Sequence, residues 1–203
     1  SVVSMAATPL AILFATRFAN MVNRLPLPAV LKYGLIPRPE STIGTIKDHL
    51  IIVGFGLNGR NLAHAARYAG IPYIIIDINP DTVLQERDKG ELIHFGDAGE
   101  EEILNHANAG EAMILVSTVP MVGDSKRIIR TVRKLNPQIH IIIRTRFVRD
   151  MSDLYELGAD EVIPEEFETS VEIFTRVLAK YLIPHEDIEN FVSRIRSDGY
   201  EMF

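Results

Sequence analysis

Four runs of apolar residues constrain the fold of this chain more than any other feature of its sequence. They read LIIV, YIII, MILV and IHIII, and polar or glycine-rich segments separate them. Continuous apolar runs are typical of strands that are buried on both faces, as in a parallel sheet between two helix layers. The runs therefore predict strands at His49–Gly54, Tyr73–Asp77, Ala112–Ser117 and Ile139–Arg144.

The segments between these runs have the character of helices. The pattern predicts helices at Asn58–Tyr68 and Asp124–Leu135, and two further short strands at Leu92–Phe95 and at residues 160–164. Repeated β-α units join parallel strands through right-handed crossovers. The predicted fold class is therefore α/β, a Rossmann-like doubly wound parallel sheet, over residues 48–164.

Residues 165–203 follow the last predicted strand and are not needed to complete the sheet. Two amphipathic helices are expected there, and Val171, Phe174 and Val177 lie on the apolar side of the first. These helices either cap the sheet or form a crossover helix and a C-terminal tail that reach a partner subunit. The pattern alone leaves both arrangements open.

The N-terminal segment is apolar and has no charged side chain before Arg17. A bilayer span needs about 20 apolar residues. We expect residues 1–22 to be the remnant of a last transmembrane helix, with an amphipathic packing helix as the alternative. The basic residues Arg17, Arg24 and Lys32 would suit the cytoplasmic side of the membrane. Residues 23–47 are rich in proline, which breaks helices, and they predict a linker.

Composition excludes several kinds of function. The net charge of −6 argues against a nucleic-acid partner, because such a partner selects a basic surface. The chain has no cysteine, so disulfides, thiolate zinc sites and cysteine nucleophiles are excluded. No histidine has the spacing of a metal ligand, so we expect no metal site and solvated or capping roles for His49, His64, His94, His106, His140 and His185.

A glycine cluster between the first strand and the first helix indicates a nucleotide site. Gly54, Gly56 and Gly59 form the G-x-G-x-x-G pattern in the strand–turn–helix context that it requires. Gly54 permits the tight turn, Gly56 lets backbone amides approach a phosphate, and Gly59 lets the helix pack against the strand. Arg60 follows, either to add positive charge at the phosphate or to lie in solvent.

Polar residues at the ends of other strands extend this predicted site. Asp77 lies 18 residues after Gly59, where an acidic side chain accepts hydrogen bonds from the ribose hydroxyls and disfavours a 2′-phosphate. NAD(H) or another adenosine nucleotide is therefore favoured over NADP(H). Asp97 is expected either near the adenosine end of the pocket or as a helix cap. Ser117 and Thr118 are expected either beside the ligand or in a turn.

The chain shows little apparatus for transforming a nucleotide. None of the six tyrosines has a lysine four residues later, so the Tyr-x-x-x-Lys pair of short-chain dehydrogenases is missing. No Ser-His-Asp set, Walker lysine or carboxylate-metal cluster is recognisable, and only about 40 residues follow the sheet for a substrate domain. We expect no catalytic residues, and a small NAD-dependent oxidoreductase is the alternative.

Five segments together resemble the KTN/RCK family, also called TrkA-N, of nucleotide-binding regulatory domains of potassium channels and transporters. They read GFGLNGRNLA, IIIDINP, HFGDAGEEEIL, IIIRTRF and LGADEVIPEEFETSVEIFTRVL. Two more segments, SMAATPLAIL and ENFVSRIRSDGYEMF, are similar to the last membrane helix and the tail of Kef-type cation:proton antiporters of the CPA2 family.

This resemblance implies a homodimer that exchanges the helix after Pro164, with NAD(H) or AMP held at Gly54, Gly56, Gly59, Asp77 and Asp97. In glutathione-gated members, arginines near the end of the fifth strand bind ligand between subunits, and Arg144 and Arg146 fall at that place. Phe147 stands where an aspartate is common in the family, so glutathione control is not implied. Surface or ion-pair roles are the alternative for both arginines.

The function expected from the sequence is regulation of ion transport. The chain would be a regulatory domain on the cytoplasmic face of the cell membrane. A membrane-embedded antiporter domain in the same polypeptide would exchange K+ for H+, under control of the bound nucleotide. An RCK subunit or domain of a potassium channel or of a Trk-type uptake system is the alternative within the resemblance.

Overall fold

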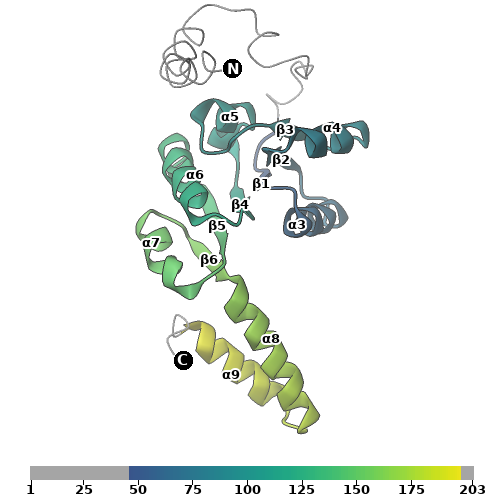
Figure 1. The fold of residues 1–203 in the computed structure, drawn as a ribbon, viewed down its shortest axis with the longest axis vertical. Coiled ribbons are helices and arrows are strands. Elements are labelled where there is room, and N and C mark those ends of the chain that lie inside the picture. Colours follow the sequence, from purple (N-terminus) through teal and green to yellow (C-terminus); the bar gives the residue numbers. More distant parts are fainter. Residues whose placement is uncertain (1–45, 198–203) are drawn as a thin grey trace, which may run out of the picture. The chain divides into compact units, whose positions relative to one another are not determined.

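The computed structural model of the chain describes residues 46–197, which form a six-stranded parallel sheet with the order β3-β2-β1-β4-β5-β6 (Figure 1). The predictions for residues 1–22 and for nearly all of the linker lie outside the described residues. The sheet confirms the predicted doubly wound fold class. Its strands are β1 (Leu50–Val53), β2 (Tyr73–Asp77), β3 (Ile93–Phe95), β4 (Ile114–Ser117), β5 (His140–Thr145) and β6 (Glu161–Pro164).

The chain reverses its direction across the sheet beside β1. This strand pairs with β2 on one side and with β4 on the other, and every strand pair is parallel. In open α/β sheets, ligands bind outside the carboxyl ends of the strands at such a switch point. The carboxyl ends of β1 and β4 therefore mark the place to look for a site.

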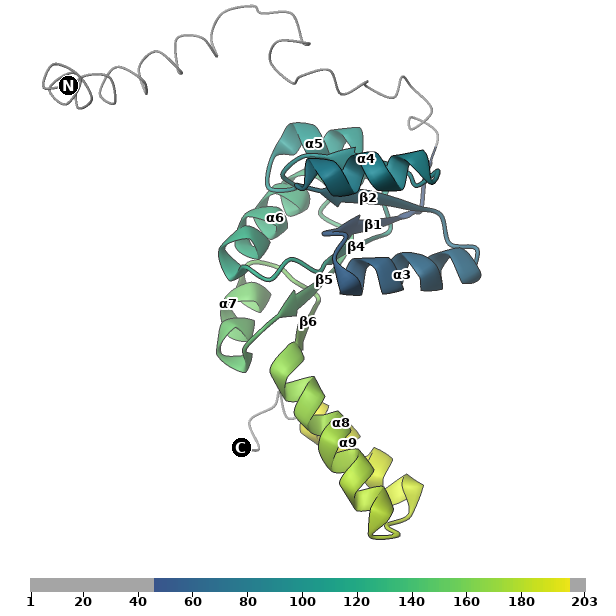
Figure 2. The same cartoon turned by 45° about the vertical axis from the view of Figure 1, so that its right-hand side comes forward.

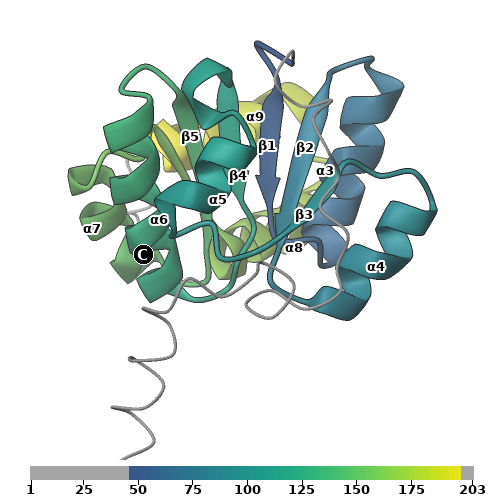
Figure 3. The same cartoon turned by 90° about the horizontal axis from the view of Figure 1, so that it is seen from above.

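Helices cover the two faces of the sheet in separate groups (Figure 3). Alternate residues of β1 divide between two buried clusters: Ile51 and Val53 belong to one, Leu50 and Ile52 to the other. The first cluster contains residues of the helices after β3, β4 and β5, and the second contains residues of the helices after β1 and β2. These helices are α3 (Leu57–Tyr68), α4 (Pro80–Asp88), α5 (Glu101–His106), α6 (Val122–Leu135) and α7 (Met151–Glu156), with 3-10 turns η2 (Ala109–Glu111) and η3 (Val148–Asp150).

Local sequence explains how the helix after β2 begins. The side chain of Asn79 accepts hydrogen bonds from the backbone of Asp81 (3.0 Å) and Thr82 (3.4 Å), and Pro80 occupies the first helical position. An asparagine cap followed by proline is a strong start signal for a helix. It fixes the turn that follows Asp77.

Two helices follow β6 and pack on each other (Figure 2): α8 (Glu165–Lys180) and α9 (His185–Ser197). The rings of Phe174 and Phe191 meet edge to face with their centroids 5.5 Å apart, and Arg196 pairs with Glu168. Val171 is the buried residue of α8, while Ile173 and Val177 remain exposed. Among residues 46–197, no helix is long and apolar enough to cross a membrane.

The histidine expectation is confirmed at one buried position and wrong at another. His49 Nε2 lies 2.9 Å from the carbonyl oxygen of Ala107, the residue that ends α5, and so acts as a cap. His94 is neither solvated nor capping, because it lies within β3 opposite Ile76. Burial, with a smaller contribution from Arg87, lowers the pKa of His94 to about 4.

Candidate functional site

The glycine loop after β1 depends on a backbone conformation that favours glycine. Gly54 has φ +89°, and a Cβ atom there would lie 3.0 Å from Thr118 Oγ1. Its N–H donates to the carbonyl of Ile76 at 2.9 Å, which continues the β1–β2 pairing into the loop. The turn therefore leaves the sheet at the switch point and directs the chain into α3.

The other two glycines serve different purposes. A Cβ atom on Gly59 would lie 2.0 Å from the carbonyl oxygen of Gly54, so no side chain fits there while the loop keeps its shape. A Cβ atom on Gly56 would meet no protein atom within 4 Å. Packing within the protein thus requires Gly59, whereas only a group outside the protein would require Gly56 to be bare.

The start of α3 offers unused hydrogen-bond donors. Gly56 is the N-cap, and the first intrahelical bond runs from Arg60 N–H to Gly56 O at 3.0 Å. The N–H groups of residues 57–59 precede that bond, as at the start of every α-helix. No acidic side chain occupies the first turn. This end of α3 therefore suits an anion such as a phosphate.

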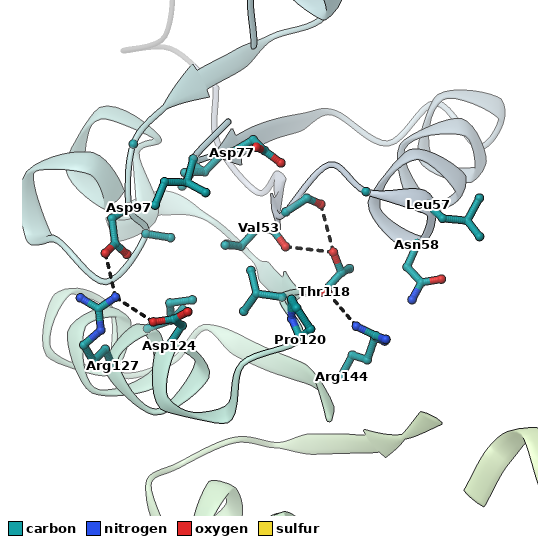
Figure 4. Close-up of a pocket in the computed structure, with 18 of the residues that line it drawn as sticks. Val53, Leu57, Asn58, Asp77, Asp97, Thr118, Pro120, Asp124, Arg127 and Arg144 are labelled. Carbon is teal, nitrogen blue, oxygen red and sulfur yellow. Dashed lines mark hydrogen bonds and ion pairs between the residues drawn. The ribbon is translucent and has the colours of Figure 1, made fainter. Parts of the chain in front are cut away.

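A cavity of about 530 Å³ lies over the loop (Figure 4). Its volume falls within the 300–1,000 Å³ that are usual for small-molecule sites. The structure brings six of the residues singled out from the sequence into its lining: Gly54, Gly56, Asp77, Asp97, Thr118 and Arg144. Leu57, Asn58, Asp124, Arg127 and Glu165 also line it.

Asp77 connects the glycine loop to the start of α4. Its Oδ2 accepts a hydrogen bond from Phe55 N–H at 2.5 Å, and its Oδ1 accepts one from Asn79 N–H at 2.7 Å. A carboxylate has about four acceptor positions, so two remain for a ligand hydroxyl. The side chain both holds the loop and faces the cavity.

Asp97 forms an ion pair that the sequence reading missed. Arg127 Nη2 lies 2.7 Å from Asp97 Oδ2 and 3.0 Å from Asp124 Oδ1, and Gly99 N–H donates to Asp97 Oδ1 at 2.8 Å. Burial opposes ionisation of Asp97, but the Gly99 amide and the Arg127 guanidinium together hold its pKa below the usual value. Of the two alternatives, the structure favours the pocket wall, because Glu100 is the N-cap of α5.

The opposite end of the cavity is formed by Thr118, Arg144 and Glu165. Thr118 Oγ1 lies within hydrogen-bond distance of the carbonyl oxygens of Val53 (3.1 Å) and Gly54 (3.0 Å). Arg144 Nη1 donates to the backbone oxygen of Thr118 at 3.1 Å, and Nη2 forms an ion pair with Glu165. Glu165, the first residue of α8, was also missed from the sequence; its acidic position after a strand was the available signal.

Three residues considered for the site lie elsewhere. Arg60 reaches back over the Phe55 ring and lies 3.4 Å from Glu86 Oε1, outside the cavity lining. Arg146 pairs with Glu166 at 2.8 Å, also outside the lining. Ser117 is fully buried. Arg60 and Arg146 therefore stand closer to their ion-pair alternatives in the described structure.

A doubly wound sheet with this loop, helix start and strand-end aspartate defines the class of protein as a Rossmann-like domain. The comparison with protein families gives the particular family. Residues 50–165 match the model of the TrkA-N domain, and the chain belongs to that family.

Known relatives are potassium transporters. The chain is 31% identical over 199 residues to K(+) efflux antiporter 1, chloroplastic, from Arabidopsis thaliana; the match covers 96% of this chain but 16% of that protein. The chain thus spans about a sixth of this relative's length.

Two solved structures share the fold. The TrkA-N domain of inner membrane protein ybaL from Escherichia coli is 28% identical, with a TM-score of 0.62, and the match covers 68% of this chain and 99% of that one. The Shewanella denitrificans Kef CTD in its AMP-bound form is 22% identical, with a TM-score of 0.64, and the match covers 76% and 96%.

Proposed function

We propose that this chain binds an adenine nucleotide, AMP or NAD(H), and that the bound nucleotide regulates a monovalent cation:proton antiporter of the K+ efflux type. The observation that carries the proposal is the surroundings of Gly56. This residue is bare toward the cavity, it precedes unused helix N–H groups, and it lies across from Asp77.

The polar groups of the cavity match the parts of an adenosine nucleotide. The α-phosphate would accept hydrogen bonds from the N–H groups that begin α3. The ribose hydroxyls would donate to the free acceptor positions of Asp77, which would repel a 2′-phosphate. The adenine would then extend toward Asp97, whose ionised carboxylate accepts hydrogen bonds from an amino group.

The family and the named relatives support the regulatory part of the proposal. TrkA-N membership, the name of the Arabidopsis relative and the AMP-bound title of the Shewanella structure all point to nucleotide control of potassium transport. Transport itself would belong to the whole protein, in which a membrane-embedded antiporter domain of the same polypeptide moves K+ and H+. This chain would lie on the cytoplasmic face of the cell membrane.

We further propose a homodimer formed through α8. Ile173, Val177 and Tyr181 are exposed on or just after this helix, and a second copy would cover them. A nucleotide moves such a dimer only if it binds one arrangement more tightly than another. The linker at residues 23–47 would pass that difference to the transporter.

Calorimetric titration of the chain with AMP, NADH and NADPH tests the nucleotide site. We expect AMP and NADH to bind and NADPH to bind far more weakly. Asp77→Asn should weaken AMP and NADH binding by about 30-fold, since it removes charged hydrogen-bond acceptors. Asp81→Asn is the matched control, because Asp81 is exposed and lies outside the cavity lining.

Two outcomes would contradict this proposal. Failure of AMP and of NADH to bind would remove nucleotide sensing, and unchanged affinity in Asp77→Asn would displace the ribose from this aspartate. The expectation that the chain is not an enzyme stays a prediction: incubation with NADH should give no loss of its 340 nm absorbance (roughly, the nicotinamide band).

A further inference from the structure

The cavity has two ends that differ in what they contact. Figure 4 shows Asp97, Asp124 and Arg127 at one end, and Asn58 and Arg144 at the other, with Thr118 between them. The strand order explains this separation, because Asp77 and Asp97 follow β2 and β3 while Thr118 and Arg144 belong to the β4–β5 side. A ligand that crosses the switch point would meet both ends.

Arg144 is only partly engaged within the protein. Nη1 donates to Thr118 O and Nη2 pairs with Glu165, while Nε is buried without a hydrogen-bond partner among the described residues. Both side chains line the cavity, and that of Glu165 is 44% exposed. A pair with one exposed partner is weak, so another anion can compete for the guanidinium.

The partner of Arg144 belongs to the root of α8. Glu165 begins the helix, and the neighbouring Glu166 pairs with Arg146, also at the end of β5. Along α8 only Val171 is buried. Since apolar packing holds little of this helix to the sheet, ion pairs at its first turn have an unusual share in fixing how it leaves β6.

The proposed pose places a second phosphate at Arg144. With the adenosine over β2 and β3 and the first phosphate at the start of α3, the rest of a longer ligand runs over β4 toward β5. AMP ends at the first phosphate. ADP or a dinucleotide continues with further negative charge into the end of the cavity that Arg144 lines.

We propose that Arg144 senses the second phosphate by exchanging partners. This inference rests on the proposed nucleotide site. A nucleotide that contains a pyrophosphate takes the guanidinium from Glu165 and frees the root of α8, whereas AMP leaves the pair intact. The exchange is favourable because arginine binds phosphate oxygens bidentately, and a diphosphate carries more charge than one half-exposed carboxylate.

Calorimetry with AMP and ADP on four forms of the chain tests the exchange. Arg144→Gln should weaken ADP binding about tenfold and leave AMP binding within about twofold of the parent. Glu165→Gln should strengthen ADP binding about threefold, because it removes the competing carboxylate. Glu166→Gln is the matched control, since it is the same substitution in the same helical turn but outside the cavity lining; both affinities should stay unchanged.

Hydrogen exchange of the α8 backbone tests the release. ADP should speed exchange at residues 165–172 in the parent chain, and AMP should not. In Glu165→Gln the exchange should be fast without ligand. Equal protection of these amides with AMP and with ADP would overturn the release of α8.

The outcomes separate this inference from the function on which it rests. If neither AMP nor ADP binds, the proposed function fails. If both bind, and Arg144→Gln weakens them equally or not at all, the exchange is overturned while the nucleotide site stands. If Arg144→Gln does not fold, Glu165→Gln decides alone, and an unchanged ADP affinity in that variant overturns the exchange.

Discussion

The two ends of the cavity each contain an arginine–carboxylate pair, but the pairs join different parts of the molecule. Arg127 connects α6 to Asp97, at the turn after β3, so both partners lie within the body of the sheet and its helices. Arg144 connects β5 to Glu165, where α8 leaves the sheet. A ligand that disturbs the first pair strains the domain itself, whereas one that disturbs the second redirects a helix. The comparison teaches that one cavity can separate recognition from response.

The pairs also differ in how strongly they are held. Asp97 receives the Gly99 amide as well as Arg127, and its pKa is lowered despite burial. Glu165 has a half-exposed side chain and one arginine partner. The recognition end is therefore set before a ligand arrives, and the response end is open to competition.

Gly59→Ala is expected to have the largest effect, because it removes the distinction between the two ends. The new Cβ would overlap the Gly54 carbonyl at 2.0 Å, and the loop that both ends share would have to move. We expect the free energy of unfolding in urea to fall by about 3 kcal/mol. Gly110→Ala is the control, since a Cβ there meets nothing within 4 Å. Wild-type stability for the Gly59 variant would mean that the loop is not the shared support.

Sequence reasoning found the parts of the site that depend on local geometry. Gly54, Gly59 and Asp77 could be placed because a strand–turn–helix imposes glycine and an acidic strand end at fixed spacings. The sheet was predictable for a similar reason, since its strands are continuous apolar runs. Element ends moved by one or two residues, as at β1 and β4.

The missed partners are those that depend on long-range packing. Arg127 lies 30 residues from Asp97, and Glu165 lies 21 residues from Arg144, so no spacing rule joins them. His94 was misread because burial within an edge strand of the sheet leaves no mark on a single polar residue. Each miss arose where the tertiary structure, and not the local segment, decides the surroundings of a side chain.

Acid should weaken the strand beside the recognition end. The pKa of His94 is about 4 in the folded chain, against 6.5 for an unperturbed histidine. Below pH 6.5 the unfolded chain takes up a proton that the folded chain refuses, so stability is full above pH 6.5 and falls toward pH 4. The loss from this group is about 3 kcal/mol. Urea unfolding at several pH values measures it.

His94→Gln should flatten this pH dependence, and the exposed His64→Gln should leave it unchanged. An equal slope in the parent and in His94→Gln would show that the acid sensitivity of the recognition end comes from other groups.

Gly56→Ala should affect both ends of a bound ligand without affecting the fold. The residue has a negative φ of −71°, and the added methyl group meets no protein atom. Stability should stay within about 0.5 kcal/mol of the parent. AMP and ADP binding should both weaken about 20-fold, because the methyl group occupies the space of the first phosphate. Unchanged AMP affinity would place the phosphate away from this loop.

Arg127→Gln is expected to give the smallest effect and to sharpen the comparison most. Without the guanidinium, the pKa of Asp97 should rise toward its usual value, and NMR titration of the carboxyl group measures this rise. A lowered pKa stabilises the fold above the ordinary value of 3.8 and is lost as the pH falls below it, so the variant should lose this contribution at a higher pH.

At neutral pH Asp97 would still be ionised in Arg127→Gln and still bonded to Gly99. AMP and ADP binding should therefore weaken equally, by about threefold. Lys126→Gln is the control, because Lys126 pairs with Asp153 outside the cavity lining. Arg144→Gln, in contrast, should affect ADP alone. If the Arg127 variant instead discriminated ADP from AMP, the ligand would lie in the reverse direction, and recognition and response would exchange ends.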